Sequence, residues 1–271
     1  LKVDYKDGDK WALMPPDMMR LKQLFAAWQT GMAKAGGWNA LFWCNHDQPR
    51  IVSRLGDDKE YREASAKMLA ACIHLMRDTP YIYQGEELGM TNAGYTSIAD
   101  YRDVESLNYY RILREQGKTE AEALTILAAR SRDNGRTPMQ WSAGPYAGFS
   151  TREPWIPLAK NHATIHVEAA QRDEDSILAF YRRLIQLRHE MPIIAEGDIR
   201  CIEEDNPDVI AYERTWQGEQ LTVLCNFRPT AVPLRHLSLQ DFADARKLLG
   251  NYPGREECLR PYEVLALYRR A

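Results

Sequence analysis

A chain of 271 residues, 45% of them hydrophobic, can bury the core of one large domain or of two smaller ones, which excludes a disordered protein. Its net charge of −3 excludes a general affinity for polyanions, so we expect no nucleic-acid partner and no membrane partner. The five cysteines are far apart and include no Cys-x-x-Cys pair, so we expect reduced thiols in a cytoplasmic protein, with no metal and no other cofactor.

Helices and strands alternate in the first part of the chain. A charged surface loop over residues 1–10 precedes an amphipathic helix that begins after Asp17. An apolar run predicts a buried strand over residues 40–43, and the next helix and strand are predicted over residues 63–76 and 81–83. This alternation is typical of parallel βα units rather than of a helical bundle or a β-sandwich.

A polar cluster stands where the first strand ends. Asn45, His46 and Asp47 follow the apolar run directly, and the carboxyl end of a buried parallel strand is where barrel enzymes place their chemistry. A carboxylate beside an imidazole can hold sugar hydroxyls and oppose a developing positive charge. The same residues also favour turns, so an ordinary turn is an equal alternative from local spacing alone.

A long insertion follows the second strand. Helices are predicted over residues 106–115 and 120–132, and a Gly- and Pro-rich loop over residues 144–157. Long loops at the top of a barrel usually shape the site. The apolar periodicity of residues 176–191 then predicts a helix that closes this part of the chain.

After Pro192 the pattern changes to short β-rich runs separated by turn residues. The predicted strands cover residues 198–202, 209–215, 221–226 and 264–268. We therefore expect two domains, residues 1–192 and residues 193–271, the second being a small antiparallel β-domain with a stabilising role.

Three long segments carry a family resemblance. They are Phe42-Trp43 with Gln48-Pro49-Arg50 around the polar cluster, the segment 79–90, and Arg132-Asp133-Asn134-Gly135-Arg136-Thr137-Pro138-Met139-Gln140-Trp141. In this order they resemble the α-amylase superfamily of glycoside hydrolases, and the third resembles its α-glucosidase branch. The resemblance implies an α/β fold built on a (β/α)8 TIM barrel, which takes about 250 residues. Because the barrel-like pattern ends near residue 191, we expect the C-terminal part of a barrel, with a long loop insertion after the eighth strand, followed by the β-domain.

The resemblance also implies roles for the polar residues. Retaining hydrolysis of α-glucosides uses a nucleophilic carboxylate, a general acid about 5 Å away, and a third carboxylate that stabilises the transition state. Asp47 is expected to be the third carboxylate, His46 to hold a glucose hydroxyl, and Asn45 to bind substrate beside them. Arg136 is expected to clamp the non-reducing end of the substrate, with a structural ion pair as the alternative.

The remaining carboxylates do not complete this catalytic set. Glu86 and Glu87 are paired after the second strand, and the resemblance makes them loop-anchoring groups. No Gly-Phe-Arg-x-Asp nucleophile motif occurs in the sequence. We expect the nucleophile and the general acid upstream of Leu1 in a longer, monomeric enzyme, so that this chain alone is inactive. A non-catalytic, amylase-like binding protein is the alternative from a different class.

The opening loop bears on the substrate. Lys2 and Lys10 are point charges suited to a phosphoryl group, and Trp11 could support a second sugar, although an ordinary solvated loop is the alternative. Leu-Lys-Val-Asp-Tyr followed by Gly-Asp-Lys-Trp resembles the trehalose-6-phosphate hydrolases of the superfamily. We expect hydrolysis of this phosphorylated disaccharide to glucose and glucose 6-phosphate, with an oligo-1,6-glucosidase (α-glucosidase) acting on isomaltose-type ends as the alternative.

Overall fold

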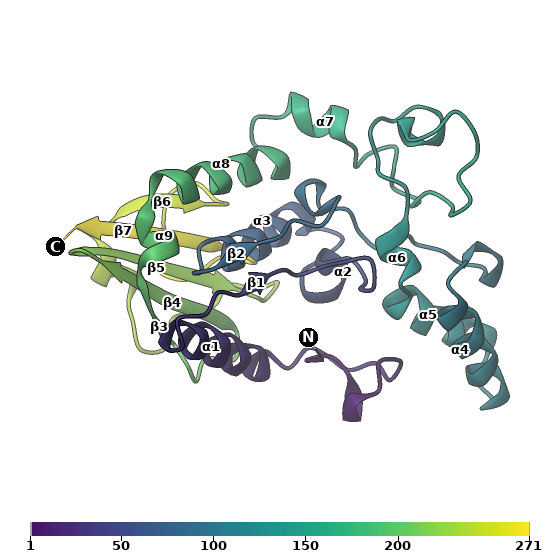
Figure 1. The fold of residues 1–271 in the computed structure, drawn as a ribbon, viewed down its shortest axis with the longest axis horizontal. Helices are drawn as coiled ribbons and strands as arrows, with labels where there is room; N and C mark the ends of the chain where they lie inside the picture. The colour runs from purple at the N-terminus through teal and green to yellow at the C-terminus, as the bar shows by residue number, and fades with distance from the viewer. Residues whose placement is uncertain (1, 271) are drawn as a thin grey trace.

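The computed structural model describes residues 2–270 and places three parts side by side (Figure 1). A β-sheet lies at one end, long helices with a pair of short strands fill the middle, and a helical insertion forms the other end. The helices are α1 (Met18–Lys34), α2 (Ile51–Leu55), α3 (Arg62–His74), α4 (Val104–Glu115), α5 (Glu120–Arg130), α6 (Asp133–Arg136), α7 (Val167–Arg172), α8 (Ile177–Glu190) and α9 (Pro192–Glu196). The strands are β1 (Ala40–Leu41), β2 (Thr79–Pro80), β3 (Asp198–Ile202), β4 (Val209–Trp216), β5 (Glu219–Asn226), β6 (Arg246–Gly250) and β7 (Val264–Arg270). Short 3-10 helices are η1 (Lys6–Gly8), η2 (Glu86–Leu88), η3 (Ile98–Asp100), η4 (Pro145–Gly148) and η5 (Leu239–Phe242).

The strands β1 and β2 pair in parallel, and α2 and α3 connect them, which confirms the predicted βα arrangement. Leu41 lies opposite Pro80, and the Tyr81 N–H donates to the Leu41 carbonyl at 2.7 Å. The predicted strand over residues 81–83 is wrong by two residues. Pairing stops there because the chain turns away at Gly85, whose φ of 90° suits glycine.

The first strand is shorter than predicted, because side-chain contacts hold the chain beyond β1 and, within the described part of the chain, it makes no further backbone hydrogen bonds to β2. The Trp43 indole N–H donates to the Leu69 carbonyl at 2.7 Å. Its ring meets Phe25 of α1 edge-on, with the centroids 5.5 Å apart. Trp43 is 2% exposed, so these contacts fix the end of β1 against α1 and α3.

Polar caps set the starts of the two helices that flank this unit. The Asp17 Oδ1 atom accepts from the Arg20 N–H at 2.9 Å at the start of α1. The Ser176 Oγ atom accepts from the Ala179 N–H at 3.2 Å at the start of α8. Both side chains satisfy backbone donors that the first helical turn leaves unpaired. The predicted helices after Asp17, over residues 63–76 and before Pro192 are confirmed as α1, α3 and α8.

The C-terminal sheet is antiparallel, with the strand order β3-β4-β5-β7-β6. The four predicted strands are confirmed as β3, β4, β5 and β7. Sequence reasoning missed β6, because Arg-Lys-Leu-Leu-Gly does not alternate polar and apolar residues. A bulge between Lys247 and Leu249 breaks the period of two at this position.

Both faces of this sheet are buried, and the alternation along each strand decides which residues face which side. One face packs on the helices through Ile210, Tyr212, Val223, Cys225 and Ala266. The other face packs beneath η5 through Val209, Ala211, Leu224, Leu265 and Leu267.

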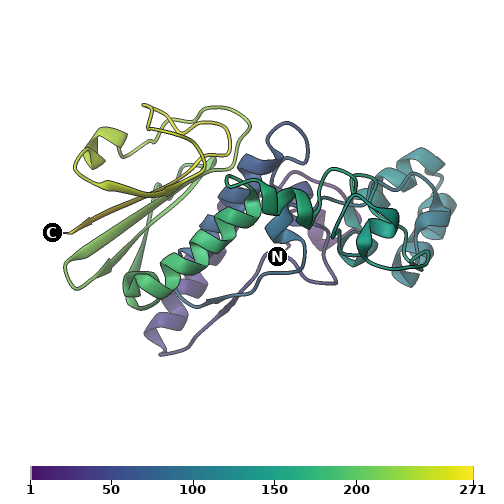
Figure 2. The ribbon, with the colours of Figure 1, turned by 90° about the horizontal axis from the view of Figure 1, so that it is seen from above.

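One hydrophobic core joins the helices to the sheet, which lies beside α8 in Figure 2. Leu21 of α1, Ile73 of α3 and Leu184 of α8 belong to the same buried cluster as the helix-facing side of the sheet. The Tyr212 hydroxyl of β4 donates to the Cys72 carbonyl of α3 at 2.9 Å. The sheet therefore packs against the helices that lie next to β1 and β2 in the chain.

The insertion has a small core of its own. Tyr95, Tyr101, Leu113 and Leu127 are buried there together with Trp11 from the opening loop. Its helices α4 and α5 confirm two predictions, but the second helix ends at Arg130 rather than at 132, and α6 begins separately. Among residues 2–270, no helix is long and apolar enough to cross a membrane.

Candidate active site

The polar cluster forms a tight turn at the end of β1. The Asp47 N–H donates to the Asn45 Oδ1 atom at 2.8 Å, and the Gln48 N–H donates to the Asn45 carbonyl at 3.2 Å. The cluster therefore adopts a turn, and the turn directs two ionisable side chains outward. The side chains of His46 and Asp47 are 69% and 44% exposed, so a solute can reach both.

Two arginines and a histidine surround the Asp47 carboxylate. Its Oδ1 atom lies 2.9 Å from Arg136 Nη2 and 3.4 Å from Arg132 Nη1, and its Oδ2 atom lies 3.3 Å from His46 Nε2. Arg136 Nε also donates to the His46 carbonyl at 2.8 Å. The predicted residues His46, Asp47 and Arg136 are therefore brought together, and Arg136 holds both the backbone of the turn and its carboxylate.

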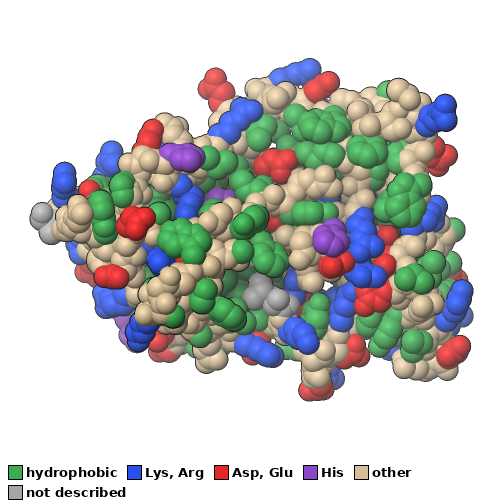
Figure 3. Space-filling model, viewed as in Figure 1, with side chains coloured by type: hydrophobic (Ala, Val, Ile, Leu, Met, Phe, Trp, Pro, Cys, Tyr) green, Lys and Arg blue, Asp and Glu red, His purple; other side chains and the backbone are tan. Residues whose placement is uncertain are grey.

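A second carboxylate, Asp103, lies behind the two arginines. It accepts from Arg132 through both oxygens, at 2.7 Å from Nη2 and 3.0 Å from Nε, and its Oδ1 atom is 3.5 Å from Arg136 Nη1. Burial raises the pKa of Asp103, but the hydrogen bonds and the charge of Arg132 outweigh it and hold the pKa below its ordinary value. Figure 3 shows acidic and basic side chains gathered around a histidine on this face.

Sequence reasoning did not single out Asp103. In the sequence it is an acidic residue just before a predicted helix, which indicates a helix start rather than a site. The only sequence feature that pointed to Asp103 is the pair Arg132 and Arg136, which lie four residues apart in the motif 132–141. Two guanidinium groups this close together are expected to bind two carboxylates, and Asp47 supplies only one.

Buried Arg50 supports the turn from below. Its Nε donates to the Asn134 carbonyl at 3.1 Å, its Nη2 to the Thr137 hydroxyl at 3.4 Å, and its Nη1 to the Gln84 carbonyl. The side chain thus ties the turn to the segment after β2 and to α6. Burial lowers the pKa of Arg50, as expected for a charged group removed from water.

Helix α6 approaches the turn closely because residue 135 is glycine. A Cβ atom on Gly135 would lie 2.6 Å from the Gln48 carbonyl oxygen, which is closer than side chains tolerate. The Gly135 carbonyl in turn accepts from the Tyr83 hydroxyl at 2.8 Å. Arg136 follows directly, so this close approach places its guanidinium group against Asp47.

The paired carboxylates after β2 remain outside this cluster. Glu87 Oε2 accepts from the Gly85 N–H at 2.8 Å, which anchors the loop. Glu86 is 4% exposed, and neither of its oxygens has a hydrogen-bond partner among the described residues. Burial raises its pKa to about 8.

The opening loop differs from its predicted arrangement. Lys10 Nζ lies 2.7 Å from Glu105 Oε2, and the same oxygen is 3.2 Å from Arg132 Nε. Lys2 is exposed. The prediction that Trp11 supports a sugar is wrong, because its ring is 6% exposed and is covered by Tyr109 at 4.6 Å and by Lys10 at 4.8 Å.

Comparison with known proteins identifies the family. The model of the family described as alpha amylase, catalytic domain, matches residues 1–197. The chain belongs to the α-amylase family. This match covers the turn, both arginines and the insertion, so the whole charged cluster lies within the part of the chain that resembles the catalytic domain.

Individual α-amylase family members resemble nearly the whole chain. The trehalose-6-phosphate hydrolase of Bacillus subtilis (strain 168) is 52% identical over 99% of this chain and 49% of its own length. The crystal structure of the Bacillus licheniformis trehalose-6-phosphate hydrolase superposes with a TM-score of 0.94 at 48% identity, over 100% of this chain and 50% of that one. The oligo-1,6-glucosidase of Halalkalibacterium halodurans is 43% identical over 97% of this chain and 48% of its own length. The chain thus spans about half the length of these family members.

Proposed function

We propose that residues 1–192 form the C-terminal part of a (β/α)8 barrel and residues 193–271 an accessory β-domain. The parallel pair β1 and β2, with α3 packed between them and the sheet, supports this arrangement. The turn after β1 then lies at the end of barrel strands where such enzymes place their catalytic groups. The antiparallel sheet contributes no residue to the charged cluster, which fits a supporting role.

The proposed activity is retaining hydrolysis of an α-glucosidic bond, with Asp47 as the carboxylate that stabilises the transition state. One observation carries it, namely that an exposed carboxylate at a strand end is held 2.9 Å from Arg136 and 3.3 Å from His46. A carboxylate in this position opposes the charge of an oxocarbenium-like sugar. His46 and Asn45 flank it as hydroxyl-binding groups, and Arg136 as the group that holds the end of the substrate.

The proposed substrate is trehalose 6-phosphate, which would give glucose and glucose 6-phosphate. The similarity to two trehalose-6-phosphate hydrolases, at 52% and 48% identity, supports this assignment. An oligo-1,6-glucosidase acting on isomaltose-type ends is the second candidate, supported by 43% identity to a family member of that name. Lys10 is the proposed phosphate contact, because its ammonium group, now paired with Glu105, stands at the edge of the charged cluster and suits a phosphoryl group. Lys2 is an exposed second candidate.

The first experiment tests catalysis by Asp47 in the full-length protein. Asp47→Asn keeps the shape of the side chain but removes its charge, so kcat should fall by about 100-fold or more while KM changes little. A change in KM alone would contradict the assignment. Residues 1–271 by themselves should show no turnover, because retaining hydrolysis needs a nucleophile and an acid for which the sequence contains no motif.

The second experiment tests the substrate. In the full-length protein, kcat/KM for trehalose 6-phosphate and for isomaltose is compared before and after Lys10→Ala and Lys2→Ala. Loss of a phosphate contact should lower kcat/KM about tenfold or more for the phosphorylated sugar alone. Equal losses on both sugars would show that these lysines have no phosphate-specific role, and activity on isomaltose alone would favour the oligo-1,6-glucosidase.

A further inference from the structure

Four charged side chains join the insertion to the turn after β1. Arg132 and Arg136 lie between the carboxylates of Asp47 and Asp103, and each arginine contacts both of them. Arg132 is 2.7 Å from Asp103 and 3.4 Å from Asp47, whereas Arg136 is 2.9 Å from Asp47 and 3.5 Å from Asp103. Each carboxylate therefore has one near and one far arginine.

Asp103 binds the arginines from a position where an aspartate usually caps a helix. It is the N-cap residue of α4, where an aspartate normally accepts from an N–H of the first helical turn. Its side chain makes no such bond, although it is only 3% exposed. It accepts instead from Arg132 and from the Ser106 hydroxyl, and its own N–H donates to Asp133 Oδ2 at 3.0 Å. The carboxylate is thus directed at the arginines at the expense of the helix cap.

We propose that Asp103 is a positioning residue that competes with Asp47 for the two arginines and thereby keeps Arg132 from closing on Asp47. The inference rests on the proposed function, because it assumes that Asp47 must meet a substrate. Its carboxylate is 44% exposed and already has Arg136 at 2.9 Å. A second close guanidinium group would occupy the remaining acceptor positions and spread its charge away from the reacting sugar.

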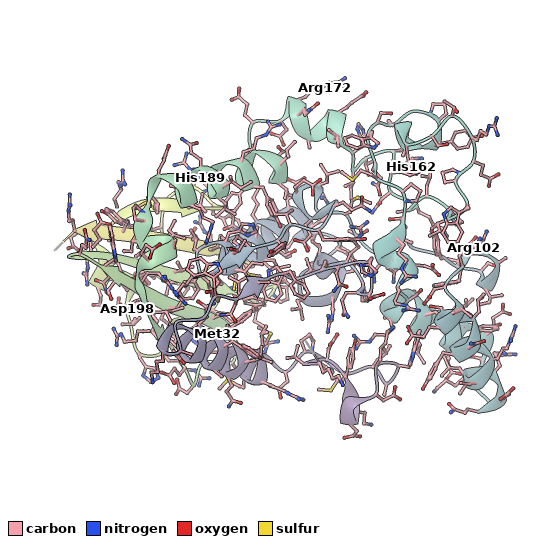
Figure 4. The ribbon with its side chains drawn as sticks, in the orientation of Figure 1. Met32, Arg102, His162, Arg172, His189 and Asp198 are labelled. Atoms are coloured by element: carbon pink, nitrogen blue, oxygen red, sulfur yellow. The ribbon has the colours of Figure 1, made fainter. Side chains whose placement is uncertain are left out.

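The contacts of Arg132 show what would happen without Asp103. Apart from Asp103, its acidic neighbours are Asp47, at 3.4 Å, and Glu105, at 3.2 Å. Glu105 is shared with Lys10, which lies 2.7 Å from the same oxygen. Asp47 is therefore the acceptor to which Arg132 can move closer. Arg102, beside Asp103, lies on the segment that leads into α4 (Figure 4), and its N–H also donates to Asp133, so the backbone there is fixed independently of the Asp103 charge.

The test uses the full-length protein and Asp103→Asn, which keeps the shape and removes the charge. We expect kcat on the substrate of the wild-type protein to fall at least about tenfold, with KM within about threefold. Asp103→Glu retains the charge and should recover most of kcat. Glu115→Gln, the same change at the exposed far end of α4, is the control and should leave kcat and Tm unchanged.

Arg132→Gln separates positioning from a general structural role. If the loss in Asp103→Asn comes from Arg132 closing on Asp47, removing Arg132 as well should restore kcat above that of Asp103→Asn alone. In the Arg132→Gln background, Asp103→Asn should then lower kcat by less than about threefold. This comparison is between Arg132→Gln and the double variant, so it can be made even if Asp103→Asn alone folds poorly. A double variant that is no more active than Asp103→Asn, or a tenfold cost in the Arg132→Gln background, would overturn the proposal. A wild-type protein that hydrolyses no α-glucoside would instead refute the proposed function.

Discussion

At the scale of single residues, Arg50 holds the turn that presents His46 and Asp47. Its guanidinium group donates to the backbone of Gln84 and Asn134. The Arg50 N–H donates to Asn92 Oδ1 at 2.9 Å. The side chain is 1% exposed, and two of the residues that accept from it, Asn134 and Thr137, are also 1% exposed, so their acceptors would be buried without this donor.

Arg50→Ala should therefore lower the free energy of unfolding by more than about 3 kcal/mol, since it leaves the buried acceptors on Asn134 and Thr137 unpaired and opens a cavity. Urea unfolding of the wild-type and variant proteins measures the difference. The matched control is Arg20→Ala on the exposed face of α1, which should change the free energy by less than about 0.5 kcal/mol. A loss in Arg50→Ala no larger than that of the control would contradict a supporting role.

Sequence reasoning selected site residues that lie within recognisable motifs and missed a residue that only packing brings to them. Asp47, His46 and Arg136 come from motifs whose resemblance to the α-amylase superfamily already implied a site, and the structure places them in contact. Asp103 joins them only because α4 and α5 fold against each other and bring Arg132 to it. Trp11 was misassigned for the same reason, since its burial depends on Tyr109 in that insertion.

At the scale of elements, periodicity predicted the long helices and the regular strands, whereas it made β1 two residues too long, misplaced β2 by two residues and missed β6. Each of the first two strands has only two paired residues, so neighbouring packing rather than a ladder fixes their ends. The bulge in β6 breaks the alternation on which strand prediction depends. The helix starts, in contrast, are encoded locally by caps such as Asp17 and Ser176.

The cap of α1 gives a direct test of this local encoding. Asp17→Ala should lower the free energy of unfolding by about 1 kcal/mol, because the Arg20 N–H loses its acceptor. Asp17→Asn retains a side-chain oxygen at the same place and should cost only a few tenths of a kcal/mol, roughly the difference between two good caps. Chemical denaturation checks both values. Equal losses in the two variants would show that the charge of Asp17, and not its cap, stabilises α1.

At the scale of the whole molecule, one core extends from Trp43 beneath the site to Val223 in the C-terminal sheet. Glu86 and His74 are among the ionisable groups buried within or beside it. Burial raises the pKa of Glu86 to about 8 from an ordinary 4.5, and lowers the pKa of His74 to about 4 from 6.5. Both groups are therefore neutral in the folded protein near neutral pH, and both make its stability depend on pH in opposite directions.

The signs follow from which state binds more protons. Between pH 4.5 and 8 the folded protein keeps a proton on Glu86 that the unfolded chain has released, so stability falls as the pH rises, by up to about 1.4 kcal/mol per pH unit. Between pH 4 and 6.5 the unfolded chain keeps a proton on His74 that the folded protein excludes, so stability rises with pH. The two slopes offset each other between pH 4.5 and 6.5, and the Glu86 slope remains alone between pH 6.5 and 8.

We therefore predict that Glu86→Gln, which keeps the side chain neutral at every pH, flattens the dependence of stability on pH between 6.5 and 8. Urea unfolding at half-unit intervals of pH measures this slope. The free energy of unfolding of the variant should increase relative to that of the wild-type protein as the pH rises. Glu60→Gln, at an exposed site, is the control and should leave the slope unchanged. If the wild-type protein and Glu86→Gln keep parallel curves over this range, Glu86 is already ionised in the folded protein and its burial does not hold the proton.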